Sequence, residues 1–242
     1  MMDTMKGKTA LVTGGSGAVG VAAVRRLVAA GCLVAFTWRS GAERAAALET
    51  ETGAFGFQVE LTDPEQVEKM VKAVEAKLGR IDILINNAGQ TQIMPFALIE
   101  AEDWDAMMSA NLKTMFLVTR ETVRGMIRRK AGVIVNVGSL AGHRLLEVPV
   151  HYAAAKAGVT GFTLALAKEL ARYNIRVNEV VPGLLTEGVG RMVPEKEMAE
   201  YMRFCSAGRA GDPAEVAEVI AFLAGGASGY MNAQSVFVDG GI

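Results

Sequence analysis

The stretch that decides the fold is Thr9-Ala10-Leu11-Val12-Thr13-Gly14-Gly15-Ser16-Gly17-Ala18-Val19-Gly20. Its apolar start predicts a short buried strand, its glycines predict a tight turn, and residues 21–30 have the pattern of a helix. In that context the glycines let the backbone approach a pyrophosphate, which the free N–H groups of the helix bind. A flexible loop is the alternative. The context favours a dinucleotide site formed by Gly14, Ser16, Gly17, Ala18, Val19 and Gly20.

The rest of the chain continues the alternation of strand and helix. Further strands are expected at about 32–38, 55–59, 81–85, 133–137, 175–181 and 234–238, with helical segments between them. This order is typical of a doubly wound, mostly parallel sheet with right-handed crossovers. We therefore predict an α/β fold: one Rossmann-like domain over residues 1–242, with about seven strands and helices on both faces. Residues 186–211, which follow a strand end, are expected to form a substrate lid.

Composition narrows the class of protein. The 242 residues are 51% hydrophobic and carry a net charge of −1, which fits one soluble domain and gives no electrostatic case for nucleic acid or a membrane surface. The two cysteines, Cys32 and Cys205, lack the spacing of metal ligands, so no metal site is expected. Free thiols, no secretory signal and no membrane-spanning run indicate a cytoplasmic protein.

The end of the second strand bears on the choice of cofactor. A fold of this kind that binds NAD usually has an acidic residue there, holding the ribose 2′-hydroxyl. This chain instead has Arg39 and Ser40, which suit a 2′-phosphate, so we predict NADP(H). The alternative is that Arg39 is a solvated loop charge. Glu60 and Leu61 end the third strand, where the adenine ring should lie.

Tyr152 and Lys156 are the strongest candidates for chemistry. Four residues apart in a helix, they share one face, and an ammonium beside a phenol favours its ionised form. Such a tyrosine exchanges protons with a substrate oxygen. Ser139 stands at the end of an expected strand, where open α/β sheets bind their ligands. A surface tyrosine with an ordinary lysine neighbour is the alternative reading.

Two asparagine sites also stand out. Asn86 and Asn87 directly follow a buried strand, so they need partners and are expected to brace the sheet and line the cofactor floor. Asn111 interrupts the apolar surface of a long helix. It is either a polar surface residue or a kink or water site that serves Lys156.

Together these motifs resemble the short-chain dehydrogenase/reductase family over nearly the whole chain. Residues 13–20 match its TGxxx(A/G)xG motif, residues 86–89 match NNAG, and the family's catalytic tetrad falls on Asn111, Ser139, Tyr152 and Lys156. The resemblance implies that Ser139 polarises a carbonyl, Tyr152 delivers the proton, Lys156 assists it and holds the nicotinamide ribose, and Asn111 positions a relay water. It also implies cofactor contacts from Asn87, Ala88, Gly89, Tyr152, Lys156, Pro182, Gly183 and Thr186. Glu60 departs from the aspartate that is common at its position.

Within the family the resemblance is greatest to 3-oxoacyl-[acyl-carrier-protein] reductases, through residues 152–158, 208–209 and 234–241. It implies NADPH-dependent reduction of a 3-oxoacyl thioester and a homotetramer. Reduction or oxidation of another substrate, such as a polyketide, sugar or cyclic ketone, is the alternative, and a non-catalytic NADP(H)-binding protein is a remote one. Arg128, Arg129, Lys130 and Arg172 either form a docking patch for an acidic carrier protein or are favourable cations at helix C-termini.

Overall fold

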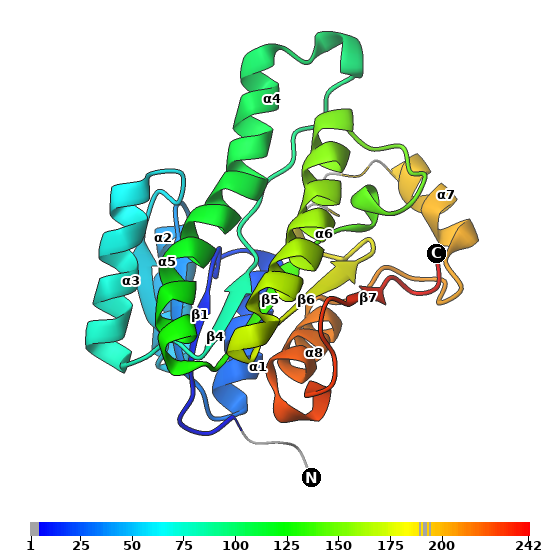
Figure 1. Cartoon of the computed structure of the whole chain (residues 1–242). Coiled ribbons are helices and arrows are strands. Elements are labelled where there is room, and N and C mark those ends of the chain that lie inside the picture. Colours follow the sequence, from blue (N-terminus) through cyan, green and yellow to red (C-terminus); the bar gives the residue numbers. More distant parts are fainter. Residues whose placement is uncertain (1–4, 189, 191–192, 194) are drawn as a thin grey trace.

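A computed structural model of the chain describes residues 5–188, 190, 193 and 195–242 (Figure 1). Across these residues one parallel sheet has the strand order β3-β2-β1-β4-β5-β6-β7. The strands are β1 (Thr9–Val12), β2 (Leu33–Trp38), β3 (Phe55–Gln58), β4 (Ile83–Asn86), β5 (Gly132–Val137), β6 (Ile175–Pro182) and β7 (Ser235–Val238). The predicted doubly wound α/β fold of about seven strands is confirmed.

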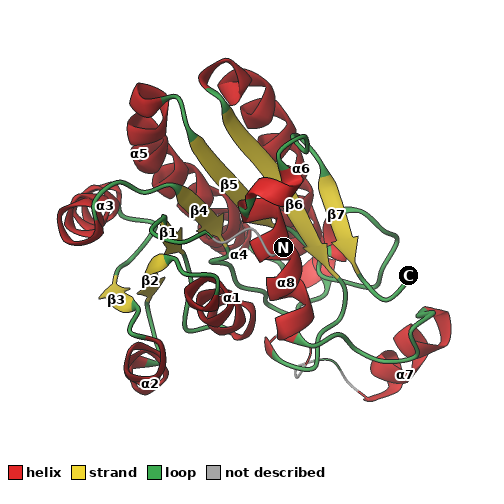
Figure 2. Ribbon diagram, turned by 90° about the horizontal axis from the view of Figure 1, so that it is seen from below, coloured by secondary structure: helices red, strands yellow, loops and turns green. Residues whose placement is uncertain are grey.

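Helices cover both faces of this sheet (Figure 2). One face carries α1 (Ala18–Ala29), α2 (Ala42–Thr52) and α8 (Pro213–Ala224), and the other carries α3 (Pro64–Leu78), α5 (Thr114–Arg129) and α6 (Val150–Leu170). Each face has its own buried apolar cluster, because strands covered on both sides are apolar throughout. α4 (Ala101–Met108) and α7 (Glu195–Phe204) lie beyond the strand ends, around the site described below.

The connection from β6 to β7 differs from the uniform right-handed crossovers expected from the sequence. From β4 to β5 to β6 the chain steps toward one edge of the sheet, with α5 and α6 on one face. The step from β6 to β7 continues in that direction, but α8 packs against α1 on the opposite face, so its hand is reversed. The long segment between β6 and α8 lets the chain change faces, and burial of Val216, Ile220 and Leu223 in the α1 cluster stabilises the result.

The helix ends follow the chemistry of their terminal residues. Asp63 caps α3 by accepting the backbone N–H groups of Glu65 and Gln66, and Pro64 takes the first position. Gly79 ends the same helix with a φ of 83°, a value that favours glycine. In the described part of the chain no helix is long and apolar enough to cross a membrane.

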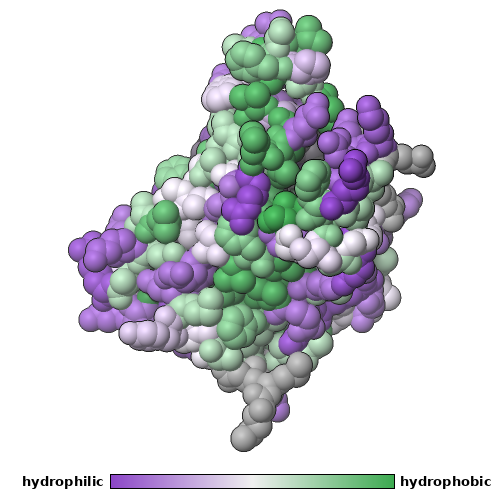
Figure 3. Space-filling view, turned by 90° about the vertical axis from the view of Figure 1, so that its right-hand side faces the viewer, coloured by the Kyte–Doolittle hydropathy of each residue, from purple (hydrophilic) through white to green (hydrophobic). Residues whose placement is uncertain are grey.

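Large apolar side chains remain exposed on α6, α8 and β7, among them Leu164, Phe222 and Phe237. Figure 3 views the molecule from that side and shows hydrophobic surface bordered by hydrophilic side chains. Exposed apolar surface of this kind is typical of a contact between protein chains. Self-association of the chain remains a prediction.

Candidate active site

One large cavity, of about 880 Å³, opens at the carboxyl ends of the strands. It lies where β1 is flanked by β2 and β4, the point at which successive connections leave toward opposite edges of the sheet. Open α/β sheets bind ligands at such a switch point. Most of the predicted site residues line this cavity: Gly14, Ser16, Gly17, Ala18, Val19, Arg39, Ser40, Glu60, Leu61, Asn87, Ala88, Gly89, Asn111, Ser139, Tyr152, Lys156, Pro182 and Gly183.

The glycine loop is shaped for close approach. Gly14 has a φ of 65°, and a Cβ there would lie 2.9 Å from Cα of Ala88. Gly17 caps α1 without a side-chain hydrogen bond, so backbone N–H groups of the first helical turn are left for a ligand. Gly20 does not line the cavity. It packs against the loop instead, and a Cβ there would clash with the carbonyl oxygen of Gly14. These residues fit a dinucleotide pyrophosphate.

The two asparagines after β4 have separate tasks. Asn86 braces the sheet, because its Nδ2 donates to Thr119 and to Asn136 on the neighbouring strand β5, each at 2.9 Å. The Nδ2 of Asn87 donates to the carbonyl oxygens of Thr13 and Gly14 at 3.0 Å. Asn87 therefore ties the strand end to the glycine loop while it lines the cavity.

The adenosine end of the cavity brings Arg39 close to Glu60. Nη1 of Arg39 lies 3.8 Å from the Glu60 carboxylate, and Nη2 donates to Gln90 at 3.4 Å, so neither contact is tight. The Glu60 carboxylate accepts the Thr62 hydroxyl at 2.8 Å. This hydrogen bond lowers the pKa of Glu60, with smaller help from the Arg39 charge. Arg39 and Glu60 therefore place opposite charges side by side at the adenosine end of the cavity.

Ser139, Tyr152 and Lys156 all line the same cavity. Lys156 is buried, and its Nζ donates to the carbonyl oxygen of Val137 at 3.1 Å and lies 5.9 Å from the centre of the Tyr152 ring. Oγ of Ser139 accepts the Ala141 N–H at 3.2 Å, which starts a short 3-10 turn after β5. The lysine and tyrosine come from α6 and the serine from the loop after β5, as the spacing predicts.

Asn111 lies at an irregularity between α4 and α5. Residues 109–113 form one π-type turn, so the long predicted helix is continuous but widened at this residue. Nδ2 of Asn111 donates to the carbonyl oxygens of Met107 and Gln90, both at 3.0 Å, whereas Oδ1 is buried without a hydrogen-bond partner. That oxygen points toward Gly89, beside Lys156 Nζ, which fits the predicted relay water better than a surface role.

Thr186 is one predicted cofactor contact that does not line the cavity. Leu185 pairs with Gly211 in a β-bridge, and the Thr186 N–H donates to the Gly211 carbonyl at 2.9 Å. Thr186 is exposed and is not among the residues that line the cavity, so its contact with the cofactor remains a prediction. Residues 189, 191, 192 and 194 of the predicted lid lie outside the described residues.

α7 lies within the segment predicted as a substrate lid, and one of its faces lines the cavity. The four lining residues are Glu197, Glu200, Tyr201 and Phe204. Their spacing of three and four is the signal that identifies such a face in a helical segment. The Leu184 N–H donates to the Tyr201 hydroxyl at 3.0 Å, and burial raises the pKa of Tyr201. The helix is thereby connected to the loop after β6.

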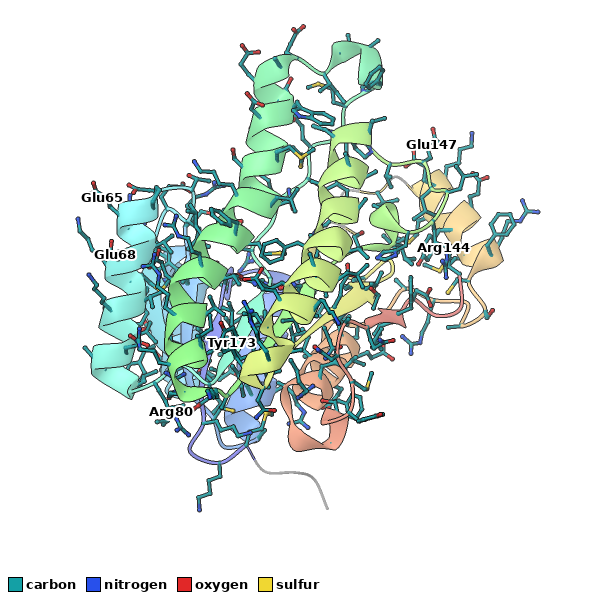
Figure 4. The ribbon with its side chains drawn as sticks, in the orientation of Figure 1. Glu65, Glu68, Arg80, Arg144, Glu147 and Tyr173 are labelled. Atoms are coloured by element: carbon teal, nitrogen blue, oxygen red, sulfur yellow. The ribbon has the colours of Figure 1, made fainter. Side chains whose placement is uncertain are left out.

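The predicted docking patch lies at the other end of the molecule. Arg128, Arg129 and Lys130 precede β5, and Arg172 precedes β6, whereas the cavity is at the far ends of these strands. Figure 4 shows Tyr173 at that end, and Arg144 and Glu147 in the loop next to α7. Arg129 also donates to the Ile81 carbonyl oxygen at 2.6 Å, so its guanidinium connects the end of α5 to the segment before β4. Docking by this patch remains a prediction.

Several known proteins are similar to this chain along its length. A 3-oxoacyl-[acyl-carrier-protein] reductase FabG of Vibrio cholerae is 35% identical and one of Thermotoga maritima is 38% identical, with 98% of each chain covered. Among solved structures, a short-chain dehydrogenase/reductase mutant of Serratia marcescens has a TM-score of 0.93 at 30% identity, with 98% of both chains covered. Together with the fold and cavity, these similarities define the class: an oxidoreductase that interconverts alcohols and carbonyls with a nicotinamide cofactor.

The family follows from the match of residues 8–197 to short chain dehydrogenases. A putative short-chain alcohol dehydrogenase of Sinorhizobium meliloti is also similar, with a TM-score of 0.91 at 33% identity over 98% of this chain and 96% of that one. The chain belongs to the short chain dehydrogenase family.

Proposed function

We propose that the protein is an NADPH-dependent reductase that converts a 3-oxoacyl thioester into the 3-hydroxyacyl thioester. The observation that carries the proposal is the convergence of Ser139, Tyr152 and Lys156 on one cavity, beside a glycine loop built for a dinucleotide. The names of the FabG relatives support the thioester.

Ser139 and Tyr152 act on the substrate carbonyl in different ways. When bound, NADPH supplies the hydride to the carbonyl carbon. Ser139 holds the carbonyl oxygen by a hydrogen bond, which fixes the orientation of the carbon and stabilises charge on the oxygen. Tyr152 donates its phenolic proton to that oxygen as it becomes an alkoxide.

Lys156 and Asn111 support the proton transfer. The Lys156 ammonium is held by the Val137 carbonyl at the edge of the site, so its positive charge stands near the Tyr152 ring. In this position it offsets the negative charge that develops in the transition state as the proton moves, and it holds the nicotinamide ribose. The unpaired Oδ1 of Asn111 orients a water that returns a proton toward Lys156.

The preference for NADPH rests on Arg39 and Ser40 at the end of β2. Among the described residues the Arg39 guanidinium makes only two long contacts, to Gln90 and Glu60, so it loses little interaction energy when it turns toward a 2′-phosphate. The strand β2 ends at Trp38, and Arg39 begins the loop that follows. Neither position holds an acidic residue, which would repel that phosphate. Glu60, two residues after β3, is the carboxylate that contacts Arg39.

Several apolar side chains line the substrate end of the cavity. Leu145, Leu146 and Val148 come from the loop before α6, and Val193 and Phe204 come from the segment after β6. Such side chains suit an acyl chain, since burial of apolar surface drives its binding.

A second candidate function has one specific observation in its favour. Glu147, Glu197 and Glu200 line the substrate end, and the lysines and arginines among the described lining residues are only Arg39 and Lys156. An acidic mouth repels the negative charge of a carrier protein or of coenzyme A. This charge favours a small neutral ketone, such as a cyclic or sugar-derived one, as the substrate.

A substrate panel separates the two candidates. Oxidation of NADPH is followed with acetoacetyl thioester on carrier protein, with the same acyl group on coenzyme A, and with uncharged cyclic ketones. The first proposal predicts the highest kcat/KM with the carrier thioester. Faster turnover of the neutral ketones at equal concentration would contradict it and support the second candidate.

A further inference from the structure

A buried carboxylate lies behind the catalytic loop and has no part in the chemistry described above. Glu179, in the middle of β6, is 0% exposed and does not line the cavity. Its Oε2 accepts the Ser235 hydroxyl at 2.6 Å, and its Oε1 accepts the Thr160 hydroxyl at 3.3 Å. In the described part of the chain the one basic side chain that contacts it is His143, whose Nε2 lies 3.5 Å from Oε1. Burial of a carboxylate is costly unless it is paired and hydrogen-bonded, so this arrangement calls for a reason.

Glu179 contacts the loop of Ser139 from both sides. Before the serine, Gly138 packs so closely that a Cβ there would clash with Oε1 of Glu179. After the serine, the 3-10 turn Leu140–Gly142 ends at His143. Ser139 thus stands between two residues that are held by one carboxylate.

The hydrogen bonds of this cluster can run in one direction from His143 through Thr160 to Glu179. Thr160 Oγ1 lies 3.0 Å from His143 Nε2 and 3.3 Å from Glu179 Oε1, but a hydroxyl has one hydrogen to give. If Thr160 donates to the carboxylate, His143 must donate from Nε2 to Thr160. This direction puts a hydrogen on Nε2 of His143.

The cluster also connects the loop to the helix that carries Tyr152 and Lys156. Thr160 is one turn after Lys156 on α6, which places both on the same side of that helix. On the β7 side the His143 ring meets the Phe237 ring edge-on, at 5.0 Å between centres. Arg144, the nearest other charge in the loop, stacks its guanidinium on Phe237 at 4.7 Å. β6, β7, α6 and the loop are thus joined at one point.

We propose that Glu179 and His143 are positioning residues that fix Ser139 relative to Tyr152 for the reaction. The pair acts through Thr160 and Gly138 and touches neither substrate nor cofactor. This inference rests on the proposed carbonyl reduction, because it assigns the pair to the geometry of that step. Displacement of a reacting group by about 1 Å costs roughly 100-fold in rate, so a loop held from both ends has a measurable effect.

The test compares variants within the cluster. Glu179→Gln keeps the shape and removes the charge, and His143→Ala removes the donor. Each is expected to lower kcat by about 10-fold or more while the KM for NADPH changes less than about two-fold. His143→Gln should recover a large part of the lost rate, since its amide N–H can donate to Thr160. Ser235→Ala is the matched control, because it removes a hydrogen bond to the same carboxylate and leaves the contacts to Gly138 and His143.

A second measurement needs no substrate. The chain has only two histidines, so the nitrogen NMR signals of His143 are assigned by their loss in His143→Ala. Protonation at Nε2 is expected in the wild-type protein, with a changed signal in Glu179→Gln. His143 is partly exposed, so its variants decide the test even if Glu179→Gln does not fold.

The outcomes separate two errors. Full kcat in His143→Ala, or an Nε2 without a proton in the wild-type protein, overturns the positioning role and leaves the proposed reaction standing. A wild-type protein that binds NADPH and reduces no carbonyl compound overturns the proposed function, and the positioning role falls with it.

Discussion

Replacement of Arg39 by alanine tests how the cavity distinguishes NADPH from NADH. The Arg39 guanidinium makes one long hydrogen bond, to Gln90 at 3.4 Å, and one loose ion pair, to Glu60 at 3.8 Å. It therefore gives up little when it turns to a 2′-phosphate. Hydrogen bonds to a charged group contribute about 1.5–3 kcal/mol, so Arg39→Ala should weaken NADPH binding by roughly 10- to 100-fold. NADH binding should change little.

Glu60→Gln provides the opposite perturbation at the same place. Hydrogen bonding from Thr62 lowers the pKa of Glu60, so the carboxylate is charged at neutral pH and repels a 2′-phosphate. Two unit charges 4 Å apart in water interact by about 1 kcal/mol, and less at greater distance. Glu60→Gln should therefore strengthen NADPH binding by about two- to five-fold, with the larger change at low salt.

Both effects are measured by calorimetric titration with NADPH and NADH and by the ratio of their kcat/KM values. Arg128→Ala, a change of an exposed arginine at the opposite end of the sheet, is the control for loss of positive charge. Equal losses for the two cofactors in Arg39→Ala, or no loss for either, would refute the reasoning and make Arg39 a solvated loop charge.

Four further predictions follow from the same structure. Tyr152→Phe should bind NADPH as the wild type does and lose roughly 100- to 10,000-fold in kcat; a smaller loss in a steady-state assay would count against its role as the acid. Arg128→Glu with Lys130→Glu should raise the KM for a carrier thioester but not for the coenzyme A thioester if carrier protein docks there, and an unchanged KM would exclude that patch. Burial raises the pKa of Cys32 from 9.0 to about 11. Stability should therefore fall as pH rises from about 9 to about 11, because the unfolded thiol ionises first, and this part of the loss should vanish in Cys32→Ala unfolding curves. Leu164→Glu, on the exposed face of α6, should shift the predicted tetramer toward smaller species in sedimentation, and an unchanged distribution would place the interface elsewhere.

The alternation of strand and helix and the main cavity residues were predictable because they depend on local signals. The glycine loop needs a strand before it and a helix after it, and the spacing of Tyr152 and Lys156 works within one turn. These signals are short in sequence, so they need no knowledge of which distant segments pack together.

Features that depend on distant segments were missed. The hand of the β6–β7 connection is decided by packing of α8 on α1, which nothing near residue 183 or 212 encodes. Glu179 and His143 are 36 residues apart and meet only because β6 lies beside β5. The Thr186 N–H donates to the Gly211 carbonyl, a partner that sequence spacing does not reveal.

The most direct test of the account measures one catalytic cycle in two proteins. Oxidation of NADPH by acetoacetyl thioester is followed with the wild-type chain and with Tyr152→Phe, after titration shows that both bind NADPH equally. The account predicts turnover in the wild type and almost none in the variant. Turnover at similar rates in both proteins would contradict the assignment of Tyr152, and with it the mechanism proposed for this cavity.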